Sequence, residues 1–385
     1  MLLTAARSHG DALGDYGMKK VCHMTSAHDE EDIRIFHKEC VSLAENGYDV
    51  YLVERGASYE KDGVHLVGVG EIHSSRLKRM TAGARKVYEA ALALDCELYH
   101  LHDPELLPFA LKLKKLGKKV VFDSHELTRE QIRIKEYLTR FAASAIAGVY
   151  GAYEDHVLNK IDAVIFPCPI EGKFPLPGKE RVYLDNFPRL REMYDRYDSD
   201  AVKEPDTVCL IGSLTEDRGV RHLALAAERA GCKLILGGSF APESFGEEIR
   251  EMAKTKNIEL LGPIDRDRVC SVMQHSVIGA DPVLNVGQYD KLDNMSTKVY
   301  EYMSLGLPVI FTRNRFNGKM ISEYGFGTCV DPQNTEEFAA AIRFLLDHPD
   351  EARRMGENGR RAVREHFSWE NEERKLLELY NKILS

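Results

Sequence analysis

The sequence predicts an α/β protein with two Rossmann-like, doubly wound domains. Three observations carry this prediction. The 385 residues exceed what one hydrophobic core usually supports. Short β-rich runs alternate with longer helical patterns, and this alternation lapses once, over residues 191–205, before it begins again. We therefore expect two parallel sheets with helices on both faces, joined by a linker.

The first alternation occupies residues 18–190. We expect its strands at 20–24, 49–53, 97–101, 119–122 and 163–166, and its helices at 33–46 and 108–116. Residues 1–17 lack the basic and apolar regions of a signal peptide, so we expect a disordered extension. Met18 is then a candidate for the biological start.

The second alternation occupies residues 206–368. Its expected strands are 208–211, 233–236, 258–260, 277–280, 308–311 and 327–330, with helices at 335–346 and 351–365. In the final stretch, 369–385, apolar residues recur at helical spacing, which predicts a helix with one apolar face. Some other surface must cover that face. Two such sheets create a cleft at the carboxyl ends of their strands, which we expect to be the active site.

Composition excludes several classes of protein. With 44% hydrophobic and 29% charged residues, and no apolar run long enough to cross a bilayer, the chain is expected to be cytoplasmic. A formal charge of -9 argues against nucleic acid as a partner. The eight cysteines lack metal-site spacing, so we expect buried, reduced thiols.

The strongest local signal lies at residues 296–310. Ser296 and Thr297 open a short helix that a Gly-Leu-Pro turn closes before a buried strand. Free backbone N–H groups and the helix dipole make such a helix start an anion site. Glu301, one turn further in, is placed to accept hydrogen bonds from the vicinal hydroxyls of a ribose. Lys298 either adds charge beside the anion or points away along the helix.

Several motifs together resemble retaining glycosyltransferases of family 4, which have the GT-B fold of two Rossmann-like domains. In this sequence the segment K298-x-x-E301-Y-M-x-x-G-x-P-V-I resembles the donor-site motif of the family. The segment G212-S-L-T-E-D-R-G219 resembles its glycine-rich phosphate loop. Two segments of the first domain resemble the part of the family's amino-terminal domain that lines the cleft: H102-D-P-E-L-L-P and V-F-D-S-H125-E. The resemblance covers residues 18–385, and it implies that the final helix returns to the first domain.

The resemblance implies a role for each donor-side residue. Arg218 would contact the diphosphate, Glu301 the ribose, and Leu261 the base, while Gly219 lets the backbone approach closely. The full donor-binding set is Gly212, Ser213, Arg218, Gly219, Leu261, Ser296, Thr297, Lys298 and Glu301. Two positions depart from the family pattern. Asp293 stands where a glutamate is usual, near the sugar hydroxyls, and Ser213 stands where arginine is frequent.

His125 matches a histidine that the family places near the donor sugar and the acceptor. With Arg218, Asp293 and Glu301 it completes the expected catalytic set. The expected acceptor-binding residues lie at strand ends of the first domain and are His28, Asp29, Asp32, Arg34, His102, Asp103, Glu105 and Glu126.

The resemblance implies transfer with retention of configuration, in which the leaving diphosphate takes the acceptor proton. No protein nucleophile, metal or cofactor is expected, and the sequence shows no nucleophile elbow. The expected donor is a UDP- or GDP-linked sugar, and the expected acceptor is a glycan or lipid-linked hydroxyl in polysaccharide or glycoconjugate synthesis. Two alternatives stay open: a nucleotide-sugar epimerase of the same fold, and a silent nucleotide-binding subunit of a transferase complex.

Two further features have competing interpretations. His100, His102 and His125, with Asp103 and Asp123, resemble a metal cluster, although strand-end His and Asp residues more commonly form hydrogen bonds. The apolar segment 141–153 is expected to be a buried helix. The alternative is a peripheral contact with the inner face of the cell membrane.

Overall fold

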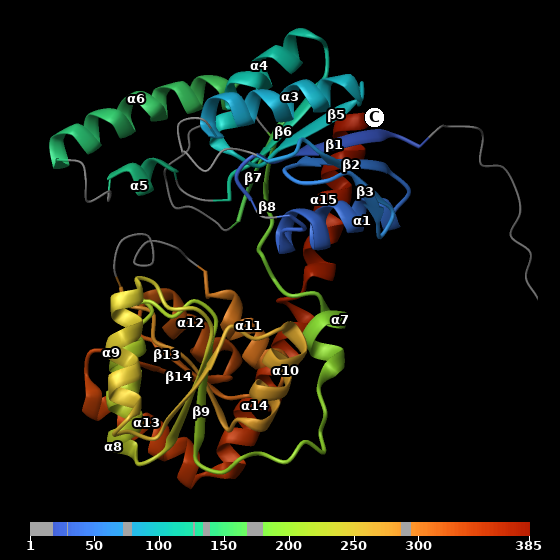
Figure 1. Ribbon diagram of the computed structural model, residues 1–385. Coiled ribbons are helices and arrows are strands. Elements are labelled where there is room, and N and C mark those ends of the chain that lie inside the picture. The colour runs from blue at the N-terminus through green and yellow to red at the C-terminus, as the bar shows by residue number, and fades with distance from the viewer. Residues whose placement is uncertain are drawn as a thin grey trace, which may run out of the picture. The chain divides into compact units, whose positions relative to one another are not determined.

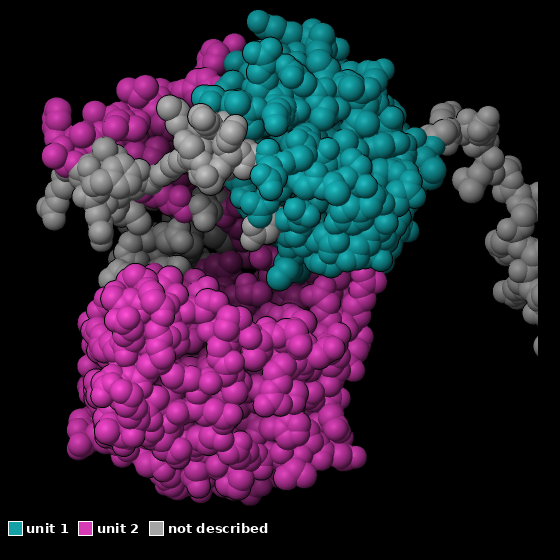
Figure 2. Space-filling view, in the orientation of Figure 1, with its two compact units in different colours: residues 1–121, 384 teal, residues 122–383, 385 magenta. Residues whose placement is uncertain are grey.

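The computed structural model describes residues 18–28, 30–71, 79–125, 128–133, 139–167, 180–285 and 294–385. The chain divides by its contacts into two compact units, residues 1–121 with 384 and residues 122–383 with 385 (Figure 2). The predicted fold class is confirmed: strands and helices alternate, and the strands form two largely parallel sheets (Figure 1).

The first sheet has eight strands in the order β3-β4-β2-β1-β5-β6-β7-β8. Their bounds are β1 (Lys20–Met24), β2 (Asp49–Glu54), β3 (Tyr59–Lys61), β4 (Val64–Gly68), β5 (Leu98–Leu101), β6 (Lys119–Asp123), β7 (Ala163–Phe166) and β8 (Glu180–Tyr183). β1 pairs in parallel with both β2 and β5, so the direction in which the sheet grows reverses at β1. The loops that follow β1 and β5 are therefore neighbours.

Helical segments connect these strands. They are η1 (Ile33–Cys40), α1 (Val41–Glu45), η2 (Arg79–Gly83), α3 (Ala84–Ala93), η3 (Pro104–Leu106), α4 (Leu107–Lys115), α5 (Thr128–Arg133) and α6 (Arg140–Leu158). In α3 the buried residues Ala84, Val87 and Ala91 recur at helical spacing, which gives the helix one apolar face.

The second sheet has six strands in the order β11-β10-β9-β12-β13-β14, and its strand pairs are parallel. The bounds are β9 (Thr207–Ile211), β10 (Lys233–Gly237), β11 (Ile258–Gly262), β12 (Ile278–Asp281), β13 (Val309–Thr312) and β14 (Gly327–Val330). The chain fills one half of the sheet outward from β9 and then returns to β12 on its other side. This reversal is the topological switch point, beside which open α/β sheets bind their ligands.

Helices cover both faces of the second sheet (Figure 1). They are α8 (Val220–Ala230), α9 (Glu243–Ala253), α10 (Arg266–His275), α11 (Thr297–Ser304), α12 (Arg315–Tyr324), α13 (Thr335–Asp347) and α14 (Pro349–Glu365). Alternate side chains of β9 enter different cores: Val208 and Leu210 pack in one cluster, Cys209 and Ile211 in the other. Burial of both strand faces explains why this strand is a continuous apolar run.

The segment expected to be a linker contains two short helical turns, α7 (Leu190–Met193) and η4 (Tyr194–Arg196). The final helix α15 (Trp369–Leu384) begins with a hydrogen bond from Trp369 N to Pro188 O of 2.9 Å. Its predicted apolar face is covered, since Leu376 and Tyr380 are fully buried.

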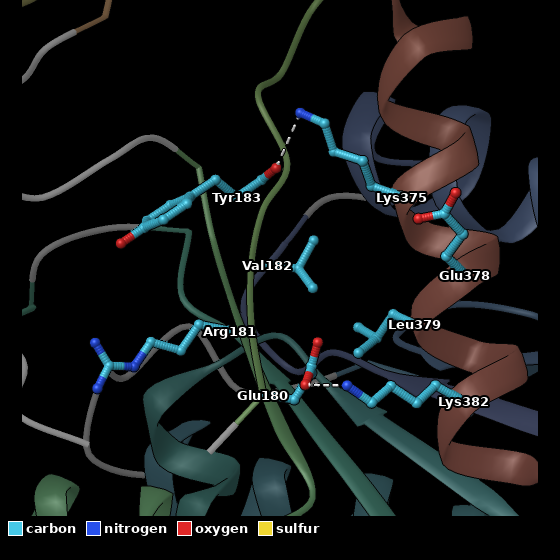
Figure 3. Close-up of a pocket in the computed structure, with 8 residues that line it drawn as sticks. All are labelled: Glu180, Arg181, Val182, Tyr183, Lys375, Glu378, Leu379 and Lys382. Carbon is cyan, nitrogen blue, oxygen red and sulfur yellow. Dashed lines mark hydrogen bonds and ion pairs between the residues drawn. The ribbon is translucent and has the colours of Figure 1, made fainter. Parts of the chain in front are cut away.

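α15 lies along β8, the last strand of the first sheet (Figure 3). Lys382 Nζ contacts Glu180 Oε2 at 2.6 Å, and Lys375 Nζ lies 3.4 Å from the carbonyl oxygen of Tyr183. A groove of about 460 Å³ separates the strand from the helix. None of the predicted site residues lines this groove.

The expectation that segment 141–153 is buried was wrong for one side of α6. Ala143 and Ala147 are buried, but Phe141 is 88% and Val149 75% exposed. Ala143, Ala147 and Gly151 form the buried side of the helix, while the larger apolar side chains lie outside. Among the described helices, none combines the length and hydrophobicity that crossing a bilayer requires.

Candidate functional site

The loops after β9 and β12 touch at the switch point of the second sheet. Gly219 closes the first loop with a φ of +70°, and a Cβ at this position would lie 2.1 Å from the carbonyl oxygen of Pro282. Leu284 N also donates to Asp217 O at 2.8 Å. Only glycine permits this approach of two backbones.

Gly212 begins the same loop, and the Lys298 side chain lies across it. Gly212 has a φ of +133°, and its N–H donates to Gly237 O at 2.7 Å. A Cβ on Gly212 would lie 2.5 Å from Lys298 Cε. The sequence left the direction of Lys298 open. In the structure it extends over the glycine-rich loop and not away along α11.

Lys298 lies among groups of both signs. Burial lowers its pKa, and Arg218 lowers it further, while Asp281, Glu301 and Asp217 act in the opposite direction. Two cationic side chains thus share a partly buried place at the end of β9. An anion bound there would relieve their mutual repulsion.

The start of α11 is held by β12. Ser296 precedes the helix, but its Oγ donates to Asp281 Oδ2 at 2.6 Å and does not cap α11. The adjacent Thr297 is exposed. No side-chain cap therefore occupies the first N–H groups of α11, and the anion site expected at this helix start stays a prediction.

Glu301 is 9% exposed and pairs with Arg266, whose Nη1 lies 2.7 Å from Glu301 Oε1. This ion pair joins α10 to α11. Arg266 was missed by sequence reasoning. It stands at the start of α10, and only the tertiary fold brings it to α11.

Two other donor-side predictions lie in the second sheet or in one of its loops. Leu261 is half-buried in β11, and Ser213 is exposed in the loop after β9. Asp293 lies outside the described residues.

Asp103 organises the loop that follows β1. Its Oδ2 accepts hydrogen bonds from Thr25 Oγ1 at 3.0 Å and from the Ala27 N–H at 3.2 Å, among others. Its Oδ1 lies 3.0 Å from His28 Nδ1. Burial alone would raise the pKa of Asp103, but the contacts with His28, the Ser26 N–H and His102 lower it. Asp103 and His28, both expected to bind the acceptor, therefore lie in contact.

Two other expected acceptor residues have contacts within the first unit, and a third is half-buried. Asp32 caps η1, accepting from Arg34 N at 2.8 Å and Ile35 N at 3.0 Å. Arg34 is buried, and its Nε lies 3.2 Å from Glu39 Oε1. Glu105 is half-buried in η3. Asp29 and Glu126 lie outside the described residues.

His125 follows β6, and its Nε2 lies 3.2 Å from Asp123 Oδ2. Asp123 is fully buried. A buried carboxylate beside one ring nitrogen fixes the orientation of the imidazole.

Comparisons with known proteins agree with this architecture. The family model described as "Glycosyl transferases group 1" matches residues 195–362, and that described as "Glycosyltransferase Family 4" matches residues 35–174. The chain therefore belongs to the family-4, group 1 glycosyltransferases.

Curated relatives match only in part. An MMP alpha-(1->4)-mannosyltransferase of Mycolicibacterium hassiacum is 25% identical over 174 residues, which is 44% of this chain and 41% of the relative. A D-inositol 3-phosphate glycosyltransferase of Corynebacterium urealyticum is 27% identical over 156 residues, 39% of this chain and 35% of that protein. The matches thus span less than half the length of these relatives.

Solved structures match over nearly the whole chain. Sucrose-phosphate synthase from Thermosynechococcus elongatus superposes with a TM-score of 0.74 and 18% identity, covering 95% of this chain and 99% of that one. Anabaena HepE, solved with UDP and glucose, gives a TM-score of 0.69 and 12% identity, with 94% and 100% coverage. At such identities the likeness shows the fold, here that of GT-B glycosyltransferases.

Proposed function

We propose that this protein is a retaining glycosyltransferase that moves a sugar from a nucleotide-sugar donor to a hydroxyl acceptor in glycan or glycoconjugate synthesis. One observation carries the proposal: Lys298 extends over Gly212 at the switch point, beside Arg218 and the start of α11. These cations and N–H groups suit a diphosphate.

In the proposed reaction the bond between the anomeric carbon and the diphosphate oxygen breaks as the acceptor oxygen binds that carbon. The acceptor proton passes to the departing diphosphate. Stabilising the negative charge that develops on this leaving group is the main catalytic term. Lys298, Arg218 and the start of α11 would supply it, so the step needs neither a metal nor a cofactor.

The nucleoside would bind one helical turn away. Glu301 has one carboxylate oxygen held by Arg266, which leaves the other to accept from ribose hydroxyls. Leu261 would border the base of a UDP- or GDP-linked donor. Asp293 would lie near the sugar hydroxyls, and His125, oriented by Asp123, would contact the sugar and the acceptor.

The acceptor is proposed to be a glycan or a lipid-linked hydroxyl, and α6 supports a peripheral membrane contact. Its exposed face from Phe141 to Tyr153 also includes Ile146 and Val149, and none of the exposed residues in this span is charged. Such a face suits the apolar boundary of a bilayer. Co-flotation with anionic liposomes that is lost in Phe141→Ser/Val149→Ser would support the contact, whereas unchanged flotation would remove it.

A donor screen tests the function. Nucleoside diphosphate release is measured for UDP- and GDP-sugars with a panel of glycan and lipid-linked acceptors, and the anomeric configuration of the product is read by NMR. Acceptor-dependent release with a retained configuration is expected. An inverted product would contradict the retaining assignment.

The same screen separates the alternatives. An epimer formed from the donor alone would indicate an epimerase. Ser213 is exposed where the family often has arginine, so one cation that would stabilise the leaving group is absent at this position. This is a specific reason to test whether the protein is a nucleotide-binding subunit without activity. Binding of nucleoside diphosphate with no turnover on any donor would support that function.

A further inference from the structure

Three histidines and one glutamate lie close together inside the first unit. None of them belongs to the predicted donor-binding residues. His23 lies on β1, while His100 and His102 lie on and just after β5. His23 and His100 are register partners of adjacent parallel strands, and positions 100 and 102 point to the same face because side chains alternate along a strand. Three imidazoles therefore share one face of the sheet.

Glu39 reaches this face from η1. Its Oε2 lies 3.9 Å from His23 Nδ1 and 3.8 Å from His100 Nδ1, and His23 Nδ1 lies 2.9 Å from His102 Nε2. One ligand atom from each of the four residues falls within 4.8 Å of all the others. Zinc bonds of about 2.0–2.1 Å to nitrogen and oxygen in a tetrahedron place ligand atoms about 3.3 Å apart. The observed separations lie on both sides of this value.

We propose that His23, Glu39, His100 and His102 bind a single Zn²⁺ ion. Imidazole and carboxylate form a suitable donor set for zinc. All four residues are at most 1% exposed, so the ion would be enclosed by protein and would have a structural role, tying β1, β5 and η1 together. The ion itself would take no part in the proposed sugar transfer, and His102, which the sequence predicted to bind the acceptor, would instead be a buried zinc ligand.

The surroundings of the cluster support a cation. Arg34 Nε holds Oε1 of Glu39 at 3.2 Å, which leaves Oε2 directed at the imidazoles, an outer-sphere contact that orients a ligating carboxylate. The pair of Glu39 with Arg34 is neutral, but the described part of this unit also buries Asp103, which interacts electrostatically with His102. That carboxylate offsets part of the charge of the ion.

The competing interpretation is a hydrogen-bonded network without metal, in which His23 and His102 share a proton. Metal content separates the two. The full-length protein is produced without a histidine tag in zinc-supplemented medium, and its metal is measured by mass spectrometry. We expect about one zinc per chain. Cobalt exchanged into the same protein should give the visible spectrum of a four-coordinate site.

The test variants are His100→Gln and Glu39→Gln, each of similar size to the original residue. The matched control is His37→Gln, because His37 lies on the same helix as Glu39 but its side chain is 39% exposed. Both test variants should lower zinc affinity at least about tenfold, and the control should retain it. A chelator such as dipicolinate should lower the melting temperature of wild type and control.

Less than about 0.1 zinc per chain in folded wild type, with no binding on titration and no chelator effect, would overturn the proposal in favour of the network. Zinc retained equally by both test variants would also overturn it. If a test variant fails to fold, the chelator and cobalt measurements on wild type still decide. Donor turnover is not part of the readout, so this proposal and the transferase function fail independently.

Discussion

Arg266 Nη1 donates to Glu301 Oε1 across 2.7 Å, linking the start of α10 to α11. Glu301 is almost buried, whereas the Arg266 side chain is 40% exposed, so the arginine is the partner that can move. The contact holds one carboxylate oxygen of Glu301, and in the proposed function the other accepts hydrogen bonds from the ribose. Arg266 is therefore expected to be a positioning residue for the donor.

Arg266→Ala should raise the KM for the donor about five- to tenfold and leave kcat nearly unchanged, because the lost contact orients a binding group and not the reacting atoms. Steady-state kinetics with the active donor measure this. Glu301→Ala should have the larger effect. In the double variant the two losses should not add, since Arg266 acts through Glu301. Additive losses would contradict this role.

Gly212→Ala should displace Lys298 and reduce nucleoside diphosphate affinity nearly as much as removal of the lysine amine. A Cβ at position 212 would collide with Lys298 Cε, and the φ of +133° adds backbone strain. Gly231→Ala is the control: Gly231 has a φ of +66° and nothing within 4 Å of its Cβ position. It should cost about 1 kcal/mol of stability and leave affinity unchanged. Equal affinities of Gly212→Ala and wild type for the nucleoside diphosphate would show that binding does not require the Lys298 side chain to lie over Gly212.

Glu54→Gln should change how stability depends on pH. Burial, with smaller contributions from Glu30 and Glu31, raises the pKa of Glu54 from 4.5 to about 7. The folded state then holds a proton that the unfolded state releases, so stability falls as pH rises from about 4.5 to 7. The glutamine variant lacks this loss and should be as much as about 3 kcal/mol more stable than wild type at pH 8. Urea denaturation at pH 5 and pH 8 measures the difference, and an identical pH profile for the two proteins would disprove it.

Asp103→Asn should show the opposite dependence. The pKa of Asp103 is lowered in the folded state, so its ionised form contributes stability above the pKa of an unfolded aspartate, and this contribution is lost as pH falls. The variant should be about 1.5–3 kcal/mol less stable than wild type at pH 7, and the gap should narrow in acid. Urea denaturation between pH 7 and pH 3 follows it. A constant gap would mean that charge at Asp103 is not the cause.

The sequence predicted the elements best where burial produces a regular pattern. The strands of the second sheet were placed to within two residues at their ends, because they are apolar runs bounded by turns. In the first sheet β3, β4 and β8 were missed; the three residues of β3 are all exposed and carry no apolar alternation. For α6 the composition predicted burial, but composition does not reveal which side of an apolar helix packs inward.

The site shows a similar division. The helix start at Ser296 has a local signature, so it was found from the residue pattern, and the glycines of the β9 loop were found through the family resemblance. Arg266 and the path of Lys298 were not, because each depends on a contact between elements that are distant in the chain. Asp32 and Arg34 have contacts within the fold that residue type alone could not show.

The most direct test of the donor site is the affinity of UDP and GDP for wild type and for Lys298→Met, measured by isothermal titration calorimetry. Methionine keeps much of the packing over Gly212 and removes the charge. Lys319→Met, on α12, controls for the loss of a charge elsewhere. We predict that Lys298→Met weakens the better nucleotide about ten- to a hundredfold, since hydrogen bonds to charged groups contribute about 1.5–3 kcal/mol, and that Lys319→Met binds like wild type. Equal affinity in Lys298→Met and wild type would contradict a diphosphate site at the start of α11.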